Sequence, residues 1–414
     1  MLQKWFAIEL WKRIMVALVL GVIVGLIWGE GAESIKWIGD IFIRLIRMLI
    51  IPLIFTTLVS GVVAMGDPKK LGSIGLKTIA LYMGTTAVAI VIGLTLAAIL
   101  QPGAGVDLAG AAPQTLEATK TAAERMYGII PINPIAALAS GNVLAVIFFS
   151  ILLGIGILLA GEKAAPVSKL FEAGAAVMLK ITHMVMEVAP FGVFALIAWI
   201  IGIGGIKTLF AVAALGVAVY GGCLFQIFVV YGSIVRFGLR LPAGRFFQGI
   251  LDAQMVAYST DSSAATLPVT MSVAEANLGI KKTISSSVLP LGATINMDGT
   301  ALYVGIVALF AAQAFGIDLD FADYLIIGLT TTLVSIGAAG VPSASLFLLA
   351  AVLESIGMTA GQTAIIVGFL LPFDRILDMM RTATNVSGDL VVATVVAKTE
   401  GEFDEASFRA APVE

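Results

Sequence analysis

The sequence is poor in the residue types that most metal, disulfide and catalytic sites require. Its 414 residues include one cysteine, Cys223, and one histidine, His183. A single cysteine excludes an intrachain disulfide, and Cys223 lies in the apolar run YGGCLFQIFVV, where we expect it to pack. A single histidine with no second His or Cys nearby excludes the usual zinc sites, and no HExxH or GxSxG motif occurs. We therefore expect neither an enzyme nor a resident cofactor.

Charge is also scarce. Only 12% of the residues are charged, the formal net charge is −3, and 59% are hydrophobic. About a quarter of the residues in a soluble domain are charged, so an ordinary soluble protein is excluded, and nothing favours nucleic acid as a partner. Several apolar runs reach the ~20 residues that a helix needs to cross a bilayer, whereas a β-barrel has short alternating segments. The composition predicts an all-α, polytopic protein surrounded by membrane lipids.

The apolar runs predict six regular spans in the first part of the chain. Lys4, Lys12 and Arg13 precede the first run without a small-residue cleavage site, so we expect a retained span and not a signal peptide. The hydrophilic segment 101–126 is expected to be a flexible connection on the outside. The predicted spans are 12–28, 36–65, 76–100, 129–160, 168–202 and 207–236.

The distribution of lysine and arginine predicts the orientation. With the N-terminus inside, the inside loops carry more of these residues than the outside loops, as the positive-inside rule requires. We expect both termini to be cytoplasmic. The inside loops then hold Lys69, Lys70, Lys77, Lys163, Lys169, Arg236, Arg240, Arg245, Lys281 and Lys282, and the outside loops hold Lys36, Lys120, Arg125 and Lys207.

Two small-residue stretches predict re-entrant hairpins. For Arg245 and Lys281 both to be inside, the chain between them must enter and leave on one face, which makes STDSSAATLP (259–268) a hairpin tip. By the same reasoning SIGAAGVPSAS (335–345) is a tip that enters from the outside. Opposite hairpins, each followed by a polar-interrupted span, are typical of an inverted repeat with a midplane binding site. The alternative is that both stretches only pack helices together; the charged helix that follows them favours the hairpins.

That charged helix contains FDRILDMMRTATNVSGD (373–389). At about 100° per residue, six polar side chains fall within an arc of about 100°, although each charge there costs ~2.5–3.5 kcal/mol on insertion scales. Intramembrane charges of this kind favour a binding site or pathway; the alternative is a structural ladder of ion pairs. The six residues are Asp374, Asp378, Arg381, Thr382, Asn385 and Asp389.

The chemistry of this face favours a ligand with charges of both signs. The planar guanidinium of Arg381 suits a carboxylate, and Asp378 offers a counter-charge for an ammonium group. An acidic amino acid carries both groups. We therefore expect Arg381 to meet its side-chain carboxylate and Asp378 its amine.

Two further carboxylates predict cation sites. Asp298 lies in NMDGT and Asp389 in NVSGD, each preceded by an asparagine (Asn296, Asn385) in a stretch where a helix is expected to unwind. Freed carbonyl oxygens together with carboxylate and amide oxygens suit a hard monovalent cation such as Na⁺. The alternative is that these aspartates are helix caps or proton carriers.

Four ordered motifs carry a family resemblance. TLPVTM, LPLGATINMDGTALY, SIGAAGVPSAS and LDMMRTATNVSGDLVVATVVAK resemble, in order and spacing, the dicarboxylate/amino acid:cation symporter family, which includes archaeal aspartate transporters and animal excitatory amino acid transporters. The resemblance covers essentially the whole chain. It implies a homotrimer in which eight transmembrane helices and two hairpins form a fixed scaffold and a transport domain that moves as an elevator. The implied parts are 1–75 (scaffold helices 1 and 2), 76–100 (transport-domain helix 3), 101–206 (outside loop and scaffold helices 4 and 5) and 207–414 (the rest of the transport domain).

The resemblance also implies a role for single residues. Arg381 would bind the side-chain carboxylate, Asp378 the amine, and Asn385 with Thr382 the main-chain groups of the substrate, while Thr300 supports the distal carboxylate. Backbone near Ser263, Val341 and Ser345 would complete the substrate pocket. Implied sodium ligands are Gly292, Asn296, Asn385 and Asp389 at one site; Tyr82, Thr85, Thr86, Asn296 and Asp298 at a second; and carbonyls near Thr294, Met297, Ser335, Ile336 and Ala338 at a third.

The sequence departs from the family pattern at several positions. Val304 stands where animal members have a glutamate used in proton coupling, and Ala338 where a threonine is common. Asp261 and Met379 occupy positions that carry an arginine in archaeal and animal members respectively, and an arginine appears instead at Arg375. We expect Asp261 and Arg375 to pair across the hairpin–helix interface, and Asp374 with Arg375 to brace the helix against the inner hairpin.

The expected function is the import of L-aspartate and/or L-glutamate coupled to Na⁺ across the cytoplasmic membrane, which is the inner membrane where there are two. Protons are the alternative coupling ion. Within the family the rival is a C4-dicarboxylate carrier, which typically has serine at the position of Asp378. Outside it the rival is a channel, which would need a continuous pore instead of an occluded midplane site.

Overall fold

The computed structural model describes residues 8, 10–64, 68–106, 130–205, 207–336 and 344–412. Within these ranges every regular element is a helix, joined by short turns and links, and one isolated antiparallel bridge connects Ile280 and Phe403. Five helical stretches of the described residues are long and apolar enough to cross a membrane: Lys12–Val63, Ile74–Leu100, Ala145–Met186, Phe210–Gly238 and Lys282–Ala314. The all-α, multi-span class predicted from the composition is therefore confirmed.

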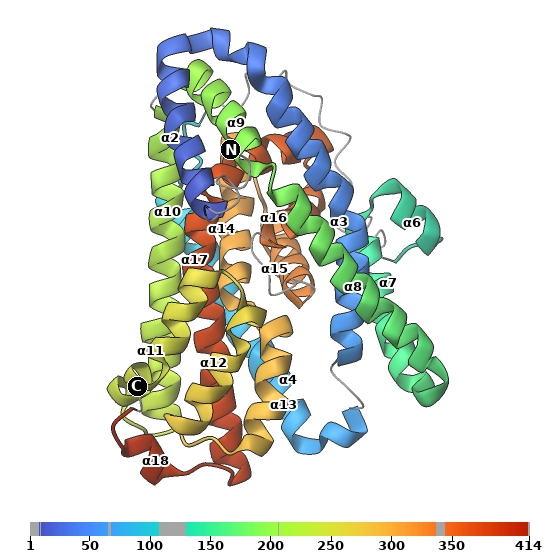
Figure 1. The fold of residues 1–414 in the computed structure, drawn as a ribbon, viewed down its shortest axis with the longest axis vertical. Coiled ribbons are helices and arrows are strands. Elements are labelled where there is room, and N and C mark those ends of the chain that lie inside the picture. The colour runs from blue at the N-terminus through green and yellow to red at the C-terminus, as the bar shows by residue number, and fades with distance from the viewer. Residues whose placement is uncertain are drawn as a thin grey trace.

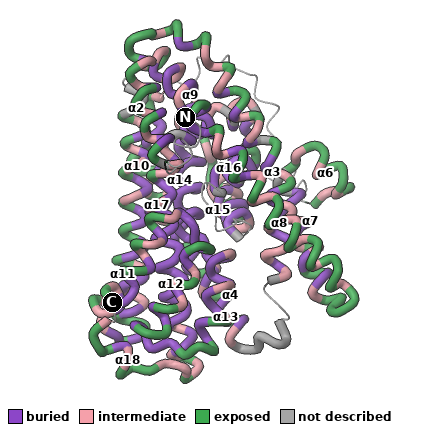
Figure 2. Tube along the Cα trace, in the orientation of Figure 1, coloured by how far each residue is buried: buried purple, intermediate pink, exposed green. Residues whose placement is uncertain are grey.

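One group of helices packs around α9 and α3. In Figure 1, α2 rises beside α9, and α3 returns along α7 and α8. The faces of α2, α7 and α8 that turn away from the molecule are largely exposed (Figure 2). The members are α2 (Leu10–Trp28), η1 (Gly29–Ile35), α3 (Lys36–Ala64), α6 (Pro134–Ser140), α7 (Val143–Ala160), η2 (Gly161–Ala164), α8 (Ala165–Met186) and α9 (Ala189–Gly204).

The second group packs around α14 and α17. Both helices are buried along most of their length, as the purple centre of Figure 2 shows. The members are α4 (Pro68–Leu100), α10 (Lys207–Phe225), η3 (Gln226–Tyr231), η4 (Ile234–Gly238), α11 (Ala243–Thr260), α12 (Ser263–Ala276), α13 (Lys282–Ile295), α14 (Asp298–Ala314), α15 (Phe321–Ile336), α16 (Ala344–Ser355), α17 (Ala360–Glu400) and α18 (Glu405–Arg409).

Three of the predicted spans are interrupted in the structure. The predicted span 129–160 contains α6 and α7, separated at Gly141, whose φ of +78° ends α6, and at Asn142, whose side chain caps α7. The predicted span 168–202 is divided between α8 and α9 at residues 187–188. The predicted span 207–236 continues from α10 into two π-helical segments, η3 and η4. Hydropathy does not register such breaks because the residues around them remain apolar.

Both predicted hairpins are present as helix pairs. Helices α11 (18 residues) and α12 (14 residues) pack together and are joined at Asp261, which is left-handed with φ of +52°, and at Ser262, whose hydroxyl caps α12. Helices α15 (16 residues) and α16 (12 residues) form the second pair. Every arm is shorter than the ~20 residues that cross a bilayer, which fits re-entrant elements. The second tip, residues 337–343, lies outside the described residues.

The helix unwinds at one of the two predicted places. Between α13 and α14, Asn296 (φ −89°, ψ 83°) and Met297 (φ −110°, ψ 53°) leave the helical conformation, so the predicted break in NMDGT is confirmed. The predicted unwinding in NVSGD is wrong, because α17 continues for 41 residues through Asp389. There the Ser387 hydroxyl donates to the Ala383 carbonyl at 2.6 Å, a bond that a helix accommodates.

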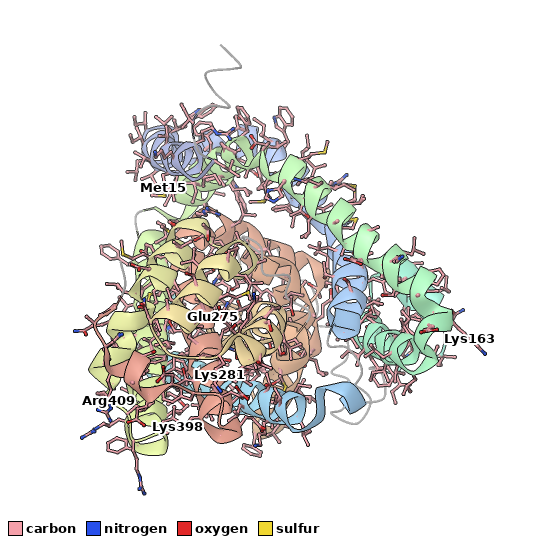
Figure 3. All side chains as sticks on the ribbon, turned by 60° about the horizontal axis from the view of Figure 1, so that its bottom comes forward. Met15, Lys163, Glu275, Lys281, Lys398 and Arg409 are labelled. Carbon is pink, nitrogen blue, oxygen red and sulfur yellow. The ribbon has the colours of Figure 1, made fainter. Side chains whose placement is uncertain are left out.

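Charged side chains gather at the end of the molecule that holds α18. Figure 3 shows Glu275, Lys281, Lys398 and Arg409 on this end. Lys281 Nζ lies 3.0 Å from a carboxylate oxygen of Glu402, which ties the loop before α13 to the segment after α17. Lys281 belongs to the basic residues that the sequence predicts to be inside; that orientation stays a prediction.

Close packing between α2 and α9 depends on glycine. A Cβ at Gly25 would lie 2.7 Å from the Ala198 carbonyl oxygen and 2.9 Å from Ile201 Cβ. Gly21, one turn earlier, faces Phe194 and Ile197 at similar distances. The two helices therefore approach as closely as small-xxx-small motifs allow.

We predict that Gly25→Ala destabilises the protein although alanine is the better helix former. Overpacking against a fixed carbonyl costs about 1–3 kcal/mol, more than the ~1 kcal/mol gained in helix propensity. Gly156→Ala in α7 is the control, because no atom lies within 4 Å of the added Cβ. The thermal unfolding temperature of the purified protein should fall for the first variant and stay constant or rise for the second. The same change in unfolding temperature for both variants would contradict the close packing at Gly25.

Candidate functional site

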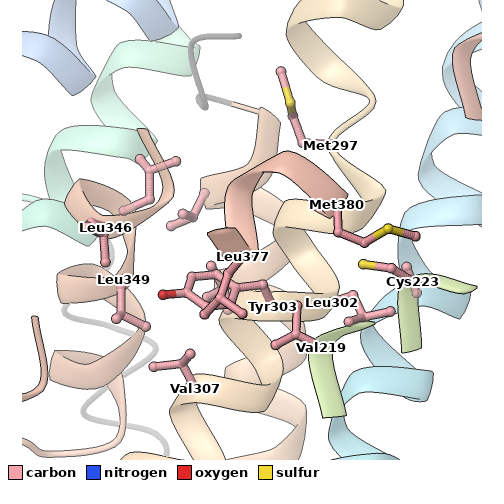
Figure 4. Close-up of a cluster of buried hydrophobic side chains, with 14 of the residues drawn as sticks. Val219, Cys223, Met297, Leu302, Tyr303, Val307, Leu346, Leu349, Leu377 and Met380 are labelled. Carbon is pink, nitrogen blue, oxygen red and sulfur yellow. The ribbon is translucent and has the colours of Figure 1, made fainter. Parts of the chain in front are cut away.

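The polar face predicted for the charged helix is buried inside the second helix group. All six residues lie on α17 with exposures of 6% or less: Asp374, Asp378, Arg381, Thr382, Asn385 and Asp389. An apolar cluster of Tyr303, Leu377 and Met380 lies beside them, together with side chains of α10 and α16 (Figure 4). This packing keeps water away and strengthens the electrostatic interactions among the buried charges.

Arg381 is the centre of the site. Its Nη2 lies 2.9 Å from Asp374 Oδ1 and 2.9 Å from Asp378 Oδ1, and the guanidinium carbon lies 3.9 Å from the centroid of the Tyr303 ring. Its Nη1 is buried and has no hydrogen-bond partner among the described residues. The binding of a substrate carboxylate by this group stays a prediction.

Asp374 makes a contact other than the one expected. It is a counter-charge of Arg381, and a brace between Asp374 and the inner hairpin stays a prediction. The two residues are seven positions apart, which is two turns of a helix and hence the same face. This spacing was a usable signal, because a long arginine side chain can reach back along its own helix.

Asn385 joins α17 to the start of α14. Its Oδ1 accepts a hydrogen bond from the Gly299 N–H at 2.7 Å, and its Nδ2 lies 3.4 Å from Thr300 Oγ1. A Cβ at Gly299 would collide with the backbone of Arg381, so glycine is needed for this approach. The structure therefore brings Arg381, Asn385 and Thr300 together as predicted.

The hairpin tips contain three of the residues predicted to complete the substrate pocket. Ser263 is buried at the start of α12, and the hydroxyl of Ser345, at the start of α16, is buried without a partner among the described residues. The predicted contribution of Val341 lies outside the described residues. The roles given to Ser263, Ser345 and Thr382 toward a substrate stay predictions.

The ion pair between Asp261 and Arg375 is confirmed. Arg375 Nε contacts Asp261 Oδ2, which joins the tip of the first hairpin to α17 one turn before Asp378. Asp261 is buried, and neither of its carboxylate oxygens accepts a hydrogen bond from the described residues, so Arg375 compensates its charge. The other side of Arg375 faces a cavity of about 280 Å³, also lined by Thr260 and by residues of α2, α8 and α9.

The first predicted set of cation ligands surrounds Asp389. Asn296 Nδ2 donates to Asp389 Oδ1 at 2.9 Å. Gly292 lies so close to Asp389 Oδ1 and to the Tyr82 hydroxyl that a Cβ there would collide with both. Asn385 lies one turn before Asp389 on α17 and bonds to Gly299. Asn296, in the break between α13 and α14, thus belongs to this set.

The second set surrounds Asp298. Thr86 Oγ1 donates to Asp298 Oδ1 at 2.6 Å, and Thr85 Oγ1 donates to Asn296 Oδ1 at 3.3 Å. The hydroxyl of Tyr82, also on α4, donates to the Val288 carbonyl at 3.0 Å. Carboxylate, amide and hydroxyl oxygens without sulfur or imidazole form a donor set that fits a hard cation.

The third set is less complete. Thr294 and Ser335 lie on α13 and α15, which are in contact, but their hydroxyls donate to carbonyls of their own helices. Met297 lies in the break before α14, the backbone of Ile336 ends α15, and Ala338 lies outside the described residues. This third site stays a prediction.

Sequence reasoning missed two residues beside Asp298. The Tyr231 hydroxyl donates to Asp298 Oδ2 at 2.6 Å, and Gln226 Nε2 lies 3.4 Å from the same oxygen. Both residues are on the π-helix η3. On an α-helix, residues five apart are separated by about 140°, so the sequence pattern did not place them on one face.

We predict that the Asp261–Arg375 pair stabilises the hairpin tip. Asp261→Asn or Arg375→Gln alone should lower the unfolding temperature, because removing one partner of a buried pair costs about 3–5 kcal/mol. The swap Asp261→Arg/Arg375→Asp should recover part of the loss. The exposed Glu405–Arg409 pair, separated by 2.7 Å, is the control, since its swap should change little. If the swap at 261 and 375 is no better than the single variants, the pair does not act as a unit.

Comparison with known proteins agrees with the motifs. Residues 10–399 match the sodium:dicarboxylate symporter family. The chain is 38% identical over 411 residues to a proton/sodium-glutamate symport protein of Geobacillus stearothermophilus, covering 95% of each. It is 39% identical to the proton/glutamate-aspartate symporter of Escherichia coli (strain K12), over 95% of this chain and 93% of that protein. It is 35% identical to C4-dicarboxylate transport protein 2 of Mesorhizobium japonicum, over 96% and 91%. The chain belongs to the sodium:dicarboxylate symporter family.

Proposed function

We propose that this protein is a secondary active symporter that imports L-aspartate and/or L-glutamate. The observation that carries the proposal is the position of Arg381 between Asp374 and Asp378 inside an apolar bundle. Two carboxylates and one guanidinium leave an excess of one negative charge. Burying that excess is costly unless a cation compensates it. The ammonium group of an acidic amino acid supplies that cation, its distal carboxylate takes the remaining donor of Arg381, and its main-chain carboxylate is left to the polar groups of Asn385 and Thr382.

The same charge balance disfavours a C4-dicarboxylate as the preferred substrate. Succinate, fumarate and malate have two carboxylates and no amine, so as dianions they add two negative charges where an acidic amino acid adds one, and they offer no positive group to Asp378. The relatives include proteins described as glutamate, glutamate-aspartate and C4-dicarboxylate transporters. The intact Asp378, 2.9 Å from Arg381, favours the amino-acid group among them.

Sodium is the coupling ion that the buried oxygens support best. Asp298 and Asp389 are fully or almost fully buried, and they accept hydrogen bonds from hydroxyl and amide groups of α4, of η3 and of the break between α13 and α14. A monovalent cation at each would offset charges that the apolar surroundings disfavour. Protons remain the second candidate, because the relatives include proteins named as proton symporters as well as proton/sodium symporters.

The two helix groups support an elevator arrangement. The α14/α17 group contains the site and both hairpins, and contacts the α2/α3/α8/α9 group along a smaller interface. We propose that the α14/α17 group moves as a transport domain (76–100 and 207–414) against a scaffold (1–75 and 101–206). The family pattern of eight spanning helices, a homotrimer and cytoplasmic termini in the inner membrane completes this proposal. Apolar side chains exposed on α7 and α8, among them Leu159 and Leu170, suit contact with lipid or another copy.

Uptake into proteoliposomes tests the function. With Na⁺ and pH gradients imposed separately, we expect labelled aspartate or glutamate to accumulate with the Na⁺ gradient. Unlabelled aspartate and glutamate should compete better than succinate, and preloaded substrate should give saturable counterflow. Uptake that does not depend on the Na⁺ gradient would overturn the assignment of Na⁺ as the coupling ion. Stronger competition by succinate than by the amino acids would overturn the assignment of the substrate class. A conductance without counterflow would favour a channel.

We predict that Asp378→Ser weakens the binding of amino acids but not of dicarboxylates. Loss of a charged hydrogen bond to the ammonium group should raise the half-saturating aspartate concentration by about 10–100-fold. Succinate should compete as well as before or better, since one negative charge is removed. Asp252→Ser on the exposed face of α11 is the matched control and should leave both values unchanged. An equal loss for aspartate and succinate would refute a role in amine recognition.

A further inference from the structure

An unusual helix geometry lies next to the second set of cation ligands. Residues Gln226–Tyr231 form the π-helix η3, in which the turns close with i→i+5 hydrogen bonds, and the Gly232 N–H bonds to the Ile227 carbonyl. Residues five apart therefore lie one above the other, whereas an α-helix separates them by about 140°. The geometry places Gln226 and Tyr231 on one face.

That face contacts the carboxylate of Asp298. The Tyr231 hydroxyl donates to Oδ2 at 2.6 Å, and Gln226 Nε2 lies 3.4 Å from the same oxygen. Thr86 donates to the other oxygen, Oδ1, at 2.6 Å. Gln226, Tyr231 and Asp298 are each 0% exposed. The carboxylate is thus oriented by donors on both sides, from α4 and from η3.

The amide of Gln226 has a defined orientation. Its Nε2 lies 3.3 Å from the Thr85 carbonyl oxygen as well as near Asp298, and both are acceptors, so the NH₂ group must face them. Its Oε1 is consequently directed elsewhere and is buried without a partner among the described residues. Since Thr85 belongs to the same ligand set, Gln226 holds a ligand-bearing segment of α4 as well as Asp298.

Tyr231 also lies against the other cation-binding helix. A Cβ at Gly388 on α17 would lie 2.7 Å from the Tyr231 hydroxyl oxygen and 2.7 Å from Asn296 Nδ2. Gly388 precedes Asp389, the carboxylate of the first ligand set. The hydroxyl of Tyr231 is therefore close to the residues that join the two sets.

We propose that Gln226 and Tyr231 are positioning residues that orient Asp298 for the transported cation and raise the affinity of the site between α4 and α14. The inference rests on the proposed sodium coupling, which it deepens. Their hydrogen bonds fix Oδ2 and leave Oδ1 directed toward the hydroxyls of α4. Groups that orient a cation ligand without contacting the ion typically change its affinity by about 10–100-fold when they are removed.

The test measures cation affinity in the purified, full-length protein without transport. The unfolding temperature with saturating L-aspartate is followed as NaCl replaces choline chloride at constant ionic strength. Tyr231→Phe should raise the half-saturating Na⁺ concentration about 10-fold. Gln226→Met should act in the same direction. A purely structural loss would lower the unfolding temperature equally at all Na⁺ concentrations and leave the half-saturating concentration unchanged.

Tyr220→Phe on α10 is the matched control. Its hydroxyl donates to the Ile376 carbonyl at 2.7 Å, away from Asp298, so the half-saturating Na⁺ concentration should not change. A half-saturating Na⁺ concentration that is unchanged or lower in both Tyr231→Phe and Gln226→Met would overturn the inference, while the proposed sodium coupling would stand. If Tyr231→Phe does not fold, the half-saturating Na⁺ concentration of Gln226→Met tests the inference alone. A wild-type protein that binds aspartate but does not respond to Na⁺ would overturn the sodium coupling and this inference together.

Discussion

The burial of unlike charges in an apolar bundle is the constraint on which the rest of the structure depends. Arg381 is fully buried, and an isolated guanidinium would not be stable there. Asp374 and Asp378 on its own helix, together with the ring of Tyr303, make the burial tolerable. The bundle around α14 and α17 must exclude water for these interactions to discriminate between ligands, which accounts for the apolar cluster beside them.

The family motifs and the contacts in the structure single out the same residues for the proposed site, but for different reasons. A motif match assigns a role to Arg381 and Asp378 one by one. The structure shows that they form one group with Asp374 whose charge is incomplete by one positive charge. Similarly, Asn296 is shared between the two cation sets, since its amide donates to Asp389 and its carbonyl oxygen accepts from Thr85. The two proposed cation sites are thus connected through Asn296.

Much of this arrangement could be predicted from the sequence because charge and small residues are rare enough in such a chain to be informative. The polar face of α17, the break at Asn296–Met297, both helix hairpins and the Asp261–Arg375 pair were predictable in this way. The predicted unwinding at NVSGD failed because Gly388 serves close packing against Tyr231 and Asn296, and not backbone flexibility. The role of Gln226 and Tyr231 could not be predicted, because it depends on a π-helical register that leaves no periodic pattern. The breaks at Gly141 and at residues 187–188 were hidden by continuous hydrophobicity.

The continuity of α17 has a mechanical consequence. Asp378, Arg381, Asn385 and Asp389 lie on a single unbroken helix, so the distances between the proposed substrate and cation ligands on it are constant. Any rearrangement around these ligands therefore has to come from the elements that face α17, such as the tip of the first hairpin and the non-helical link at Asn296–Met297. A cation that reorganises this link would be felt by Thr300 and Gly299, three to four residues further on, without any bending of α17. Helix α17 is therefore the fixed part of the proposed site, and the short link beside it is the part that couples the proposed cation ligands to the proposed substrate ligands.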